Sequence, residues 1–246
     1  PGGKTVQLAA MLRNHGFLLS NDISPKRVKP LRRNLEGLGV SCAAVSNEDP
    51  GHLAAVFPDF FDAILLDVPC SGEGMFRKDE TAVRSWKRHD AQELQHIQRS
   101  LLTAARAMLR PGGRMVYSTC TYNPDENEGN IAWALERYPD LSVVPAPSHE
   151  GGLASGRVDW VPGHPELAGA VRVWPHLAHG EGQFAVLLHK SADASFVPFV
   201  GVSIPENGGK GRVKPAGKHP QGREPGTQRP MLPAPAEALE AVKAFC

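Results

Sequence analysis

Cysteine is scarce in this sequence. The chain holds only four cysteines, Cys42, Cys70, Cys120 and Cys246. They form no CxxC pair and no Cys/His cluster, which excludes a disulfide scaffold and a structural zinc site. His176 and His179 lie close together, but no third ligand accompanies them, so we expect no metal. This cysteine usage is typical of a reducing compartment, and we expect a cytoplasmic protein.

Long apolar runs and an excess of one charge are also missing. No run of about 18 apolar residues and no signal peptide is present, so the sequence does not predict a membrane protein. Lys plus Arg (27) nearly cancel Asp plus Glu (26), which leaves a formal net charge of +1. Any contact with nucleic acid must therefore come from local basic patches. Because the sequence begins at a proline, we interpret it as a fragment. We also expect the protein to be a monomer.

Short apolar runs rich in branched residues alternate with stretches of helical period. The predicted strands cover residues 17–20, 40–46, 62–68 and 114–119, followed by 141–144, 171–174 and 183–189. The first group alternates with helices and predicts parallel strands, whereas the second lacks long intervening helices and predicts an antiparallel edge. The pattern therefore predicts an α/β protein with a mostly parallel sheet.

Capping signals predict where three helices begin. Ser24 and Pro25 are typical of an N-cap and a first helical residue, although the interior Pro30 predicts a kink or a late first turn. A pair like a capping box, residues 90 and 93, precedes an amphipathic stripe that runs from Leu94 to Met108. Asp125 is predicted to cap a helix that carries Ile131 and Leu135 and that Pro139 stops.

Composition divides the chain into three parts. Residues 1–190 have the periodicity of a folded α/β domain. Residues 191–234 lose it and become basic and rich in Pro and Gly, which predicts a flexible linker. Residues 235–246 regain a helical pattern, and we interpret them as the start of a further, truncated domain.

The sequence opens on glycines that lead into a helix. Gly2 and Gly3 at a helix start let a ligand approach the backbone N–H groups, and the helix N-terminus favours an anionic group. Asp22 follows the next strand about 20 residues on, where an acidic side chain accepts hydrogen bonds from ribose. Together they favour a nucleoside-containing cofactor. An ordinary glycine turn, with Asp22 as a turn residue before the Ser24 cap, is the alternative.

Two predicted strands each end in a cysteine. The strand at 62–68 delivers Asp67 and Cys70, and the strand at 114–119 delivers Cys120. Carboxyl ends of neighbouring strands form the edge where ligands bind in open α/β folds, so we expect both thiols in one crevice. Either cysteine taken singly is more economically interpreted as a small core hydrophobe.

Four segments resemble a known family in order and spacing. PGGKT, Asp22, DVPCSGEG and STCTYNPDENE resemble the bacterial ribosomal-RNA m5C methyltransferases of the RsmF type, within the wider group of RNA cytosine-5 methyltransferases. The resemblance covers about residues 1–190. It implies a Rossmann-like, class I methyltransferase domain with a seven-stranded, mostly parallel sheet and antiparallel edge, whose first strand would precede Pro1. It also implies S-adenosylmethionine as cofactor.

The resemblance assigns cofactor contacts to particular positions. Gly2, Gly3 and Lys4 would border the methionine end, and Asp22 the ribose. Asn47 and Asp49 fall where the family contacts adenine. The full implied set is Pro1, Gly2, Gly3, Lys4, Asp22, Asn47, Asp49, Asp67 and Pro69.

The resemblance also assigns the catalytic roles. Cys120 would add to C6 of cytosine, which makes C5 nucleophilic toward the cofactor's methyl group. The thiol needs a lowered pKa or a base, because the thiolate is the reactive form. Asp67 would hydrogen-bond the base edge and favour protonation at N3. Cys70 would help to release the methylated product.

The expected partner is RNA, most naturally small-subunit rRNA. Arg77 and Lys78 follow the Cys70 turn and are candidates for phosphate contacts, although a solvated charged loop is equally consistent. Arg172 and His176 lie in a block that resembles the substrate side of the family. Alternatives are a tRNA m5C methyltransferase, a DNA cytosine methyltransferase in which the PC thiol is the nucleophile, and an inactive RNA-binding module on the same fold.

Overall fold

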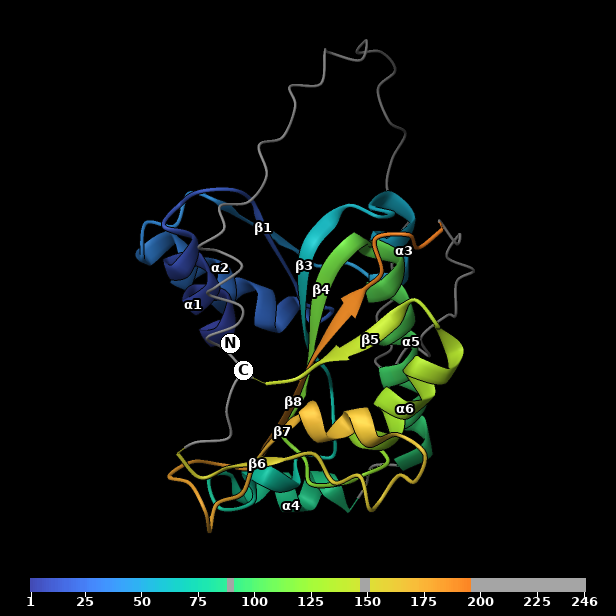
Figure 1. Cartoon of the computed structure of the whole chain (residues 1–246). Helices are drawn as coiled ribbons and strands as arrows, with labels where there is room; N and C mark the ends of the chain where they lie inside the picture. Colours follow the sequence, from blue (N-terminus) through green and yellow to red (C-terminus); the bar gives the residue numbers. More distant parts are fainter. Residues whose placement is uncertain (88–90, 147–150, 196–246) are drawn as a thin grey trace.

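The computed structural model describes residues 1–87, 91–146 and 151–195. The predicted capping residue at position 90 lies outside the described residues, as do most of the predicted linker, from residue 196 on, and the predicted helical segment 235–246. Strands occupy the centre of the described part, with α1 and α2 on one side and α3, α5 and α6 on the other (Figure 1). The predicted α/β class is confirmed.

The helices follow the predicted alternation. They are α1 (Gly3–Leu12), α2 (Pro25–Gly37), α3 (Pro50–Val56), α4 (Glu80–Trp86), α5 (Ala91–Met108) and α6 (Glu128–Arg137), with 3₁₀ turns η1 (Glu73–Met75) and η2 (Pro165–Gly169). Helices α3 and α4 were not predicted, and both are only 7 residues long. Such short helices carry too few residues for a visible period. Among the described residues, no helix is both long enough and apolar enough to cross a membrane.

The strands form two sheets. They are β1 (Leu18–Asn21), β2 (Ala43–Ser46), β3 (Phe61–Asp67), β4 (Leu109–Thr119), β5 (Leu141–Val144), β6 (Leu153–Ser155), β7 (Val171–Val173) and β8 (Gln183–Lys190). Strands β1 and β2 pair in parallel as a separate two-stranded sheet. In the larger sheet β3 and β4 are parallel, and β4 then pairs antiparallel with β8. The antiparallel edge is confirmed; the two sheets replace the single sheet that was expected.

The capping prediction for α2 is confirmed, with Ser24 at the N-cap and Pro25 as the first helical residue, whereas the capping prediction for α6 is wrong. Helix α2 begins at Pro25 and continues through Pro30, so the late first turn is not found. The buried Leu31, which is 4% exposed, helps to hold the helix despite the bond that proline removes. Helix α6 begins at Glu128, with Asn127 at its N-cap, and not directly after Asp125. The Asp125 N–H donates to the side-chain oxygen of Asn123 in the preceding turn.

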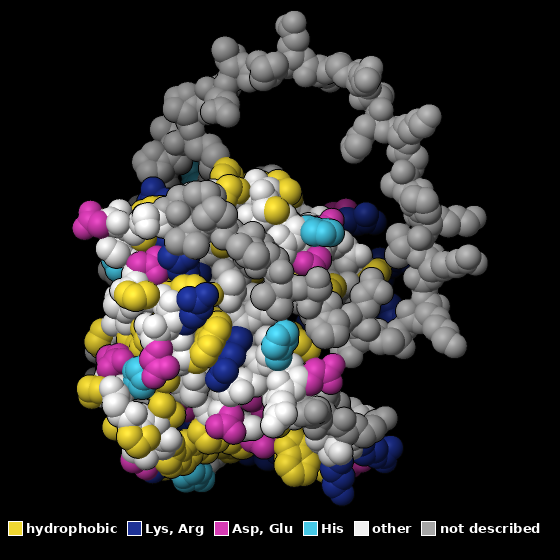
Figure 2. Space-filling view, turned by 90° about the vertical axis from the view of Figure 1, so that its right-hand side faces the viewer, with side chains coloured by type: hydrophobic (Ala, Val, Ile, Leu, Met, Phe, Trp, Pro, Cys, Tyr) yellow, Lys and Arg dark blue, Asp and Glu magenta, His cyan; other side chains and the backbone are white. Residues whose placement is uncertain are grey.

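The main core lies between the larger sheet and helices α5 and α6. Its buried residues come from β4, β8, α5 and α6, among them Leu102, Met115, Ile131 and Leu188. On the outer face of this layer Lys and Arg, Asp and Glu, and hydrophobic side chains are intermingled (Figure 2). Helix α5 packs on β3 and β4, the two strands that lead to Cys70 and Cys120.

Candidate active site

Strands β3 and β4 bring both predicted cysteines to one edge of the sheet. The parallel register pairs Asp67 with Ser118, and the Val68 N–H donates to the Ser118 carbonyl at 3.2 Å. The segments that follow, residues 68–74 and 120–127, are called the cysteine loops below. Because the strands end side by side, Cys70 and Cys120 face each other across these loops, as predicted.

The two thiols are in direct contact. Their sulfur atoms lie 3.3 Å apart, and the Cys120 N–H donates to the Cys70 Sγ at 3.3 Å. Both cysteines are free and only partly buried. The hydrogen bond from the Cys70 thiol lowers the pKa of Cys120, with a smaller lowering by Lys4, against partial burial and the charge of Asp67. The same bond, and then burial, raise the pKa of Cys70. Cys120 is therefore the thiol poised to ionise.

Glycines let the cysteine loops approach the loop before β8. The Gly74 N–H donates to the Cys120 carbonyl at 2.9 Å, and the Gly182 N–H donates to the Gly74 carbonyl at 3.2 Å. A Cβ atom at Gly74 would collide with the carbonyl oxygens of Gly182 and Cys120, and one at Gly182 would collide with the Tyr122 ring. The last glycine of the DVPCSGEG segment is thus required by close backbone contact.

A buried carboxylate and a buried amide hold the backbone on both sides of Cys70. The Glu126 carboxylate accepts from the Ser71 N–H at 3.0 Å and from the Gln98 side chain at 2.8 Å. Gln98 also donates to the Pro69 carbonyl at 2.8 Å. Glu126 is 1% exposed and Gln98 is 0% exposed, so these bonds are shielded from water.

Sequence reasoning missed this pair. Gln98 follows Leu94 by four residues, and this spacing places it on the buried stripe of α5, a signal that would have found it. Glu126 lies before the first turn of α6, where periodicity gives no signal. A further link joins the loops directly, because the hydroxyl groups of Ser71 and Thr121 are 2.7 Å apart.

The glycine loop, residues 1–5, lies beside the cysteine loops. The Lys4 ammonium is 2.9 Å from the Asp67 carboxylate, and their side chains are 35% and 54% exposed. Gly2 has a left-handed φ of 97°, and nothing lies within 4 Å of the position that a Cβ atom on Gly3 would take. The start of α1 therefore offers backbone N–H groups with open space before them.

The other predicted cofactor residues gather at the ends of β1 and β2. Asn47 donates to the Asp22 carbonyl at 2.7 Å. The Asp22 carboxylate accepts from the Ser24 N–H at 2.9 Å and pairs with Arg27 at 3.0 Å, so the turn role left open for it is present. Asp49 caps α3 through the Gly51 N–H at 2.7 Å. Each carboxylate retains lone pairs that are free to accept from a ribose or adenine.

The four residues predicted to contact RNA differ in their exposure. Arg77 is exposed but donates to the Gly180 carbonyl at 3.0 Å and pairs with Glu181 at 3.2 Å. Lys78 and His176 are exposed.

Pro69, predicted near the cofactor, is exposed in the first cysteine loop.

Arg172 corrects the prediction made for it. The side chain is 1% exposed, and its guanidinium binds both carboxylate oxygens of Glu128, which is 0% exposed, and the Tyr122 carbonyl. A buried, fully engaged guanidinium does not reach a phosphate. Arg172 instead joins β7 to the start of α6 and to the second cysteine loop.

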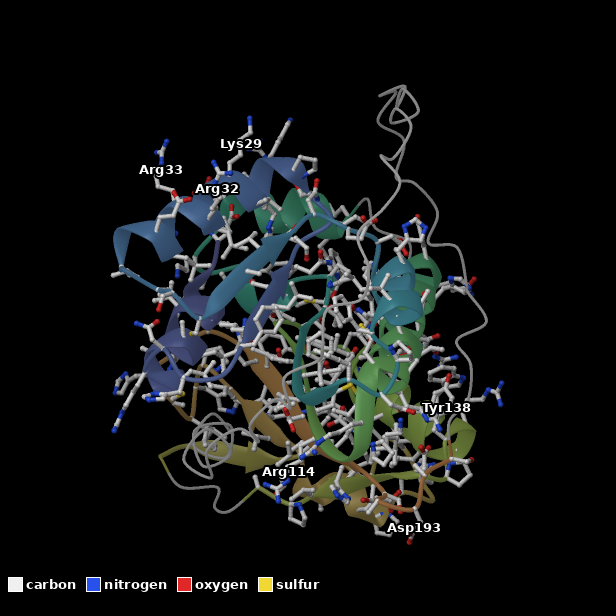
Figure 3. The ribbon with its side chains drawn as sticks, turned by 90° about the horizontal axis from the view of Figure 1, so that it is seen from above. Lys29, Arg32, Arg33, Arg114, Tyr138 and Asp193 are labelled. Atoms are coloured by element: carbon white, nitrogen blue, oxygen red, sulfur yellow. The ribbon has the colours of Figure 1, made fainter. Side chains whose placement is uncertain are left out.

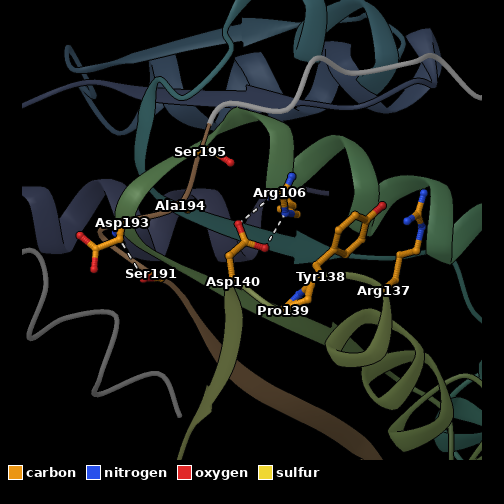
Figure 4. A pocket seen from close by; sticks show the side chains of 9 residues that line it. All are labelled: Arg106, Arg137, Tyr138, Pro139, Asp140, Ser191, Asp193, Ala194 and Ser195. Atoms are coloured by element: carbon orange, nitrogen blue, oxygen red, sulfur yellow. Dashed lines mark hydrogen bonds and ion pairs between the residues drawn. The ribbon is translucent and has the colours of Figure 1, made fainter.

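A separate pocket lies away from the thiols. It has a volume of about 490 Å³ and is lined by residues of α5, α6 and the ends of β5 and β8 (Figure 4). The ion pair of Arg106 with Asp140, at 2.6 Å, crosses it. No cysteine or histidine lines it, so it lacks a thiol or imidazole for catalysis. The described residues also contain no group of three His, Cys, Asp or Glu side chains that would hold a metal ion.

Comparisons with known proteins agree with this arrangement. The family model of the 16S rRNA methyltransferase RsmB/F matches residues 1–189. The ribosomal RNA small subunit methyltransferase F of Klebsiella pneumoniae is 40% identical over 205 residues, 83% of this chain and 41% of the relative. The same enzyme from Cronobacter sakazakii is 39% identical over 199 residues, 80% of this chain and 40% of the relative. The chain therefore spans about two fifths of the length of the curated relatives it matches.

Solved structures share the fold. A methyltransferase homolog protein from Pyrococcus horikoshii is 32% identical, with a TM-score of 0.64 over 77% of this chain and 58% of that chain. NSun6 from Pyrococcus horikoshii with SFG is 28% identical, with a TM-score of 0.65 over 78% of this chain and 46% of that chain. The predicted Rossmann-like methyltransferase class is confirmed. Given the match over residues 1–189, the chain belongs to the 16S rRNA methyltransferase RsmB/F family.

Proposed function

We propose that this chain transfers a methyl group from S-adenosylmethionine to C5 of a cytosine in RNA, with small-subunit rRNA as the substrate. The observation that carries the proposal is the contact of the two thiols at 3.3 Å, with the pKa of Cys120 lowered and that of Cys70 raised. Methyl transfer to an already nucleophilic atom needs no thiol pair. Activation of a cytosine ring carbon needs one thiolate, and a second thiol beside it can assist release of the product.

The residues around the glycine loop fit S-adenosylmethionine. The open space at Gly3 and the N–H groups of α1 suit a carboxylate, and Asp22 suits ribose hydroxyls. Asn47 and Asp49 lie nearby for the adenine, with Pro1, Gly2, Lys4, Asp67 and Pro69 completing the proposed lining. When bound, this cofactor supplies a methyl group on a positively charged sulfur. A similar structure was determined with SFG, an analogue of S-adenosylmethionine.

The first step uses Cys120. Its thiolate adds to C6 of the cytosine, the C6–S bond forms, and the electron pair of the C5–C6 bond makes C5 nucleophilic. We assign to Asp67 a hydrogen bond to the base edge, where protonation at N3 makes C6 more electrophilic. C5 would then form a bond to the methyl carbon as the bond from that carbon to the cofactor's sulfur breaks, which would leave the sulfur as a neutral thioether.

The second step uses Cys70. Adduct formation converts Cys120 into a neutral thioether, which removes the first cause of the raised pKa of Cys70. Cys70 then loses its proton to water more easily, and its thiolate accepts the proton from C5 while the electron pair of the C5–H bond restores the C5–C6 double bond and the C6–S bond breaks. The Cys120 thiolate leaves, and methylated cytosine results. Both thiols must stay reduced, which suits a cytoplasmic setting.

The target base must leave its stack to reach the thiols. Family membership favours small-subunit rRNA over tRNA as the source of that base. We propose that residues 1–190 form the catalytic domain. Lys78 and His176 stay candidates for contacts beside the target base because both are exposed.

Two single variants test this proposal. We expect Cys120→Ala to abolish methylation and Cys70→Ala to accumulate a covalent RNA–protein adduct, visible as a band of reduced mobility on a denaturing gel. Cys42→Ala is the control, because Cys42 is a free, buried cysteine that belongs to neither cysteine loop. Full activity without Cys120 would overturn the assignment. The reversed phenotypes would favour the DNA-type mechanism, and no S-adenosylmethionine binding would favour an inactive module.

A further inference from the structure

Helix α2 carries an unusual concentration of basic side chains. Its exposed charged residues are Lys26, Arg27, Lys29, Arg32, Arg33 and Glu36. Three of the basic side chains, Lys29, Arg32 and Arg33, point away from the body of the molecule (Figure 3). The whole chain has a net charge of only +1. This helix is therefore a local basic patch on an otherwise balanced protein.

Two of the five basic side chains have acidic partners. Arg27 pairs with Asp22 at 3.0 Å, at the end of β1. Arg32 pairs with Glu36 one helical turn on, at 3.4 Å. These two guanidinium groups are partly neutralised, and Arg27 also belongs to the proposed cofactor side of the helix.

The other three form one line along the helix. Lys26, Lys29 and Arg33 follow the spacing i, i+3, i+7 and make no ion pair with any acidic residue in the described ranges 1–87, 91–146 and 151–195. They lie opposite Leu31 and Leu35, each 4% exposed, which pack toward β1 and β2. We call Lys26, Lys29 and Arg33 the basic stripe.

Contacts connect the helix that carries this stripe to the proposed active site. Asn34 of α2 donates to the Pro1 carbonyl at 3.0 Å, and Arg33 lines a hollow of about 400 Å³ together with Gly2 and Gly3. The same glycine loop reaches the first cysteine loop through Lys4 and Asp67. Helix α2 therefore borders the glycine loop, which in turn lies beside the strand end that leads to Cys70.

We propose that the basic stripe binds the phosphate backbone of the RNA substrate. The inference rests on the proposed function and extends it. Of the arginines predicted to contact RNA, Arg77 is ion-paired with Glu181 and Arg172 is buried, so the phosphate contacts need other basic side chains. Lys26 and Arg33 are about 10 Å apart along the helix axis, at about 1.5 Å per residue. This length spans about three phosphates, at about 3.4 Å per charge along one strand of a duplex.

The test removes the three charges together. In K26Q/K29Q/R33Q we expect the affinity for a 16S rRNA transcript to fall about tenfold or more at moderate salt. The slope of log affinity against log salt should become shallower by about 2 to 3, since each lost phosphate contact removes about 0.7 to 0.9. The melting temperature should not change, and K26Q/K29Q, which keeps Arg33 at the hollow beside Gly2 and Gly3, should bind S-adenosylmethionine like the wild type. A charge-preserving variant, K26R/K29R, should bind like the wild type.

A matched control removes three charges elsewhere. R110Q/R114Q/R137Q alters side chains away from α2, with Arg114 on the opposite edge of the molecule (Figure 3), and should keep the wild-type slope. An equal slope loss in the control, or an unchanged slope in the stripe variant, overturns the proposal. The proposal is also overturned if the stripe variant loses binding to phosphatidylserine vesicles while its affinity for RNA equals that of the wild type. If the wild type methylates no RNA but the stripe variant still loses binding, the proposed function fails and the stripe stands.

Discussion

The glycine loop is joined to β3, just before the first cysteine loop, by the ion pair of Lys4 with Asp67, yet the two loop regions are built differently. Around Cys70 the backbone is held by buried groups, with Gln98 and Glu126 exposed by 0% and 1%. Around the glycine loop the linking side chains are partly exposed, at 35% for Lys4 and 54% for Asp67. Addition of sulfur to one ring carbon tolerates little displacement, whereas a carboxylate can be bound by N–H groups and a flexible ammonium.

The largest effect should come from filling the contact between the cysteine loops and β8. Gly74→Ala places a methyl group against two backbone carbonyls, which cannot move without shifting Cys120. We expect methylation to fall by about 100-fold or more, because a displacement of about 1 Å can cost that much. Single-turnover kinetics on 16S rRNA would measure it.

Gly37→Ala provides the comparison for this variant. Nothing lies within 4 Å of the added methyl group there, and the position is helical. This change should leave activity intact and stabilise the fold slightly, by about 0.5–1 kcal/mol. Equal activities of the two variants would show that the close approach at Gly74 does not position the thiols.

A smaller effect should follow from changing the buried carboxylate. Glu126→Gln keeps the shape of the side chain but replaces a charged acceptor with a neutral one, which weakens the bonds that Gln98 and the Ser71 N–H donate to a single carboxylate oxygen. We expect a loss of about 1–3 kcal/mol in stability and roughly tenfold slower release of product, seen as a longer-lived adduct. Asp125→Asn removes the same charge one residue away at an exposed site and should change neither. An adduct of unchanged lifetime would limit Glu126 to a role in folding.

The contrast between the two regions also explains what the sequence predicted. Cys70 and Cys120 were found because each follows a branched, apolar strand, and parallel strands end at one edge. Glu126 was missed because it lies in an irregular turn. Arg172 was assigned to the RNA because its segment resembles the substrate side of the family, and only the tertiary structure brings Glu128 of α6 against its guanidinium.

The fold could be predicted from the sequence only where an element has a local period. Long helices and apolar strands have periods that sequence reveals, and their bounds differ from prediction by a few residues. The order of strands within the larger sheet depends on pairings between distant segments, such as β4 with β8. Local periodicity carries no information about those pairings.

The smallest effect should come from the exposed ion pair at the glycine loop. Lys4→Gln should change stability by no more than about 1 kcal/mol, as for other partly exposed pairs. The hydrogen bond from Cys70 is the main cause of the lowered pKa of Cys120, but Lys4 also lowers it and Asp67 raises it. Removing Lys4 should therefore move the pH at which Cys120 reacts with iodoacetamide upward, and Asp67→Asn should move it downward. Shifts in the same direction for both variants would show that these charges do not act on the Cys120 thiol.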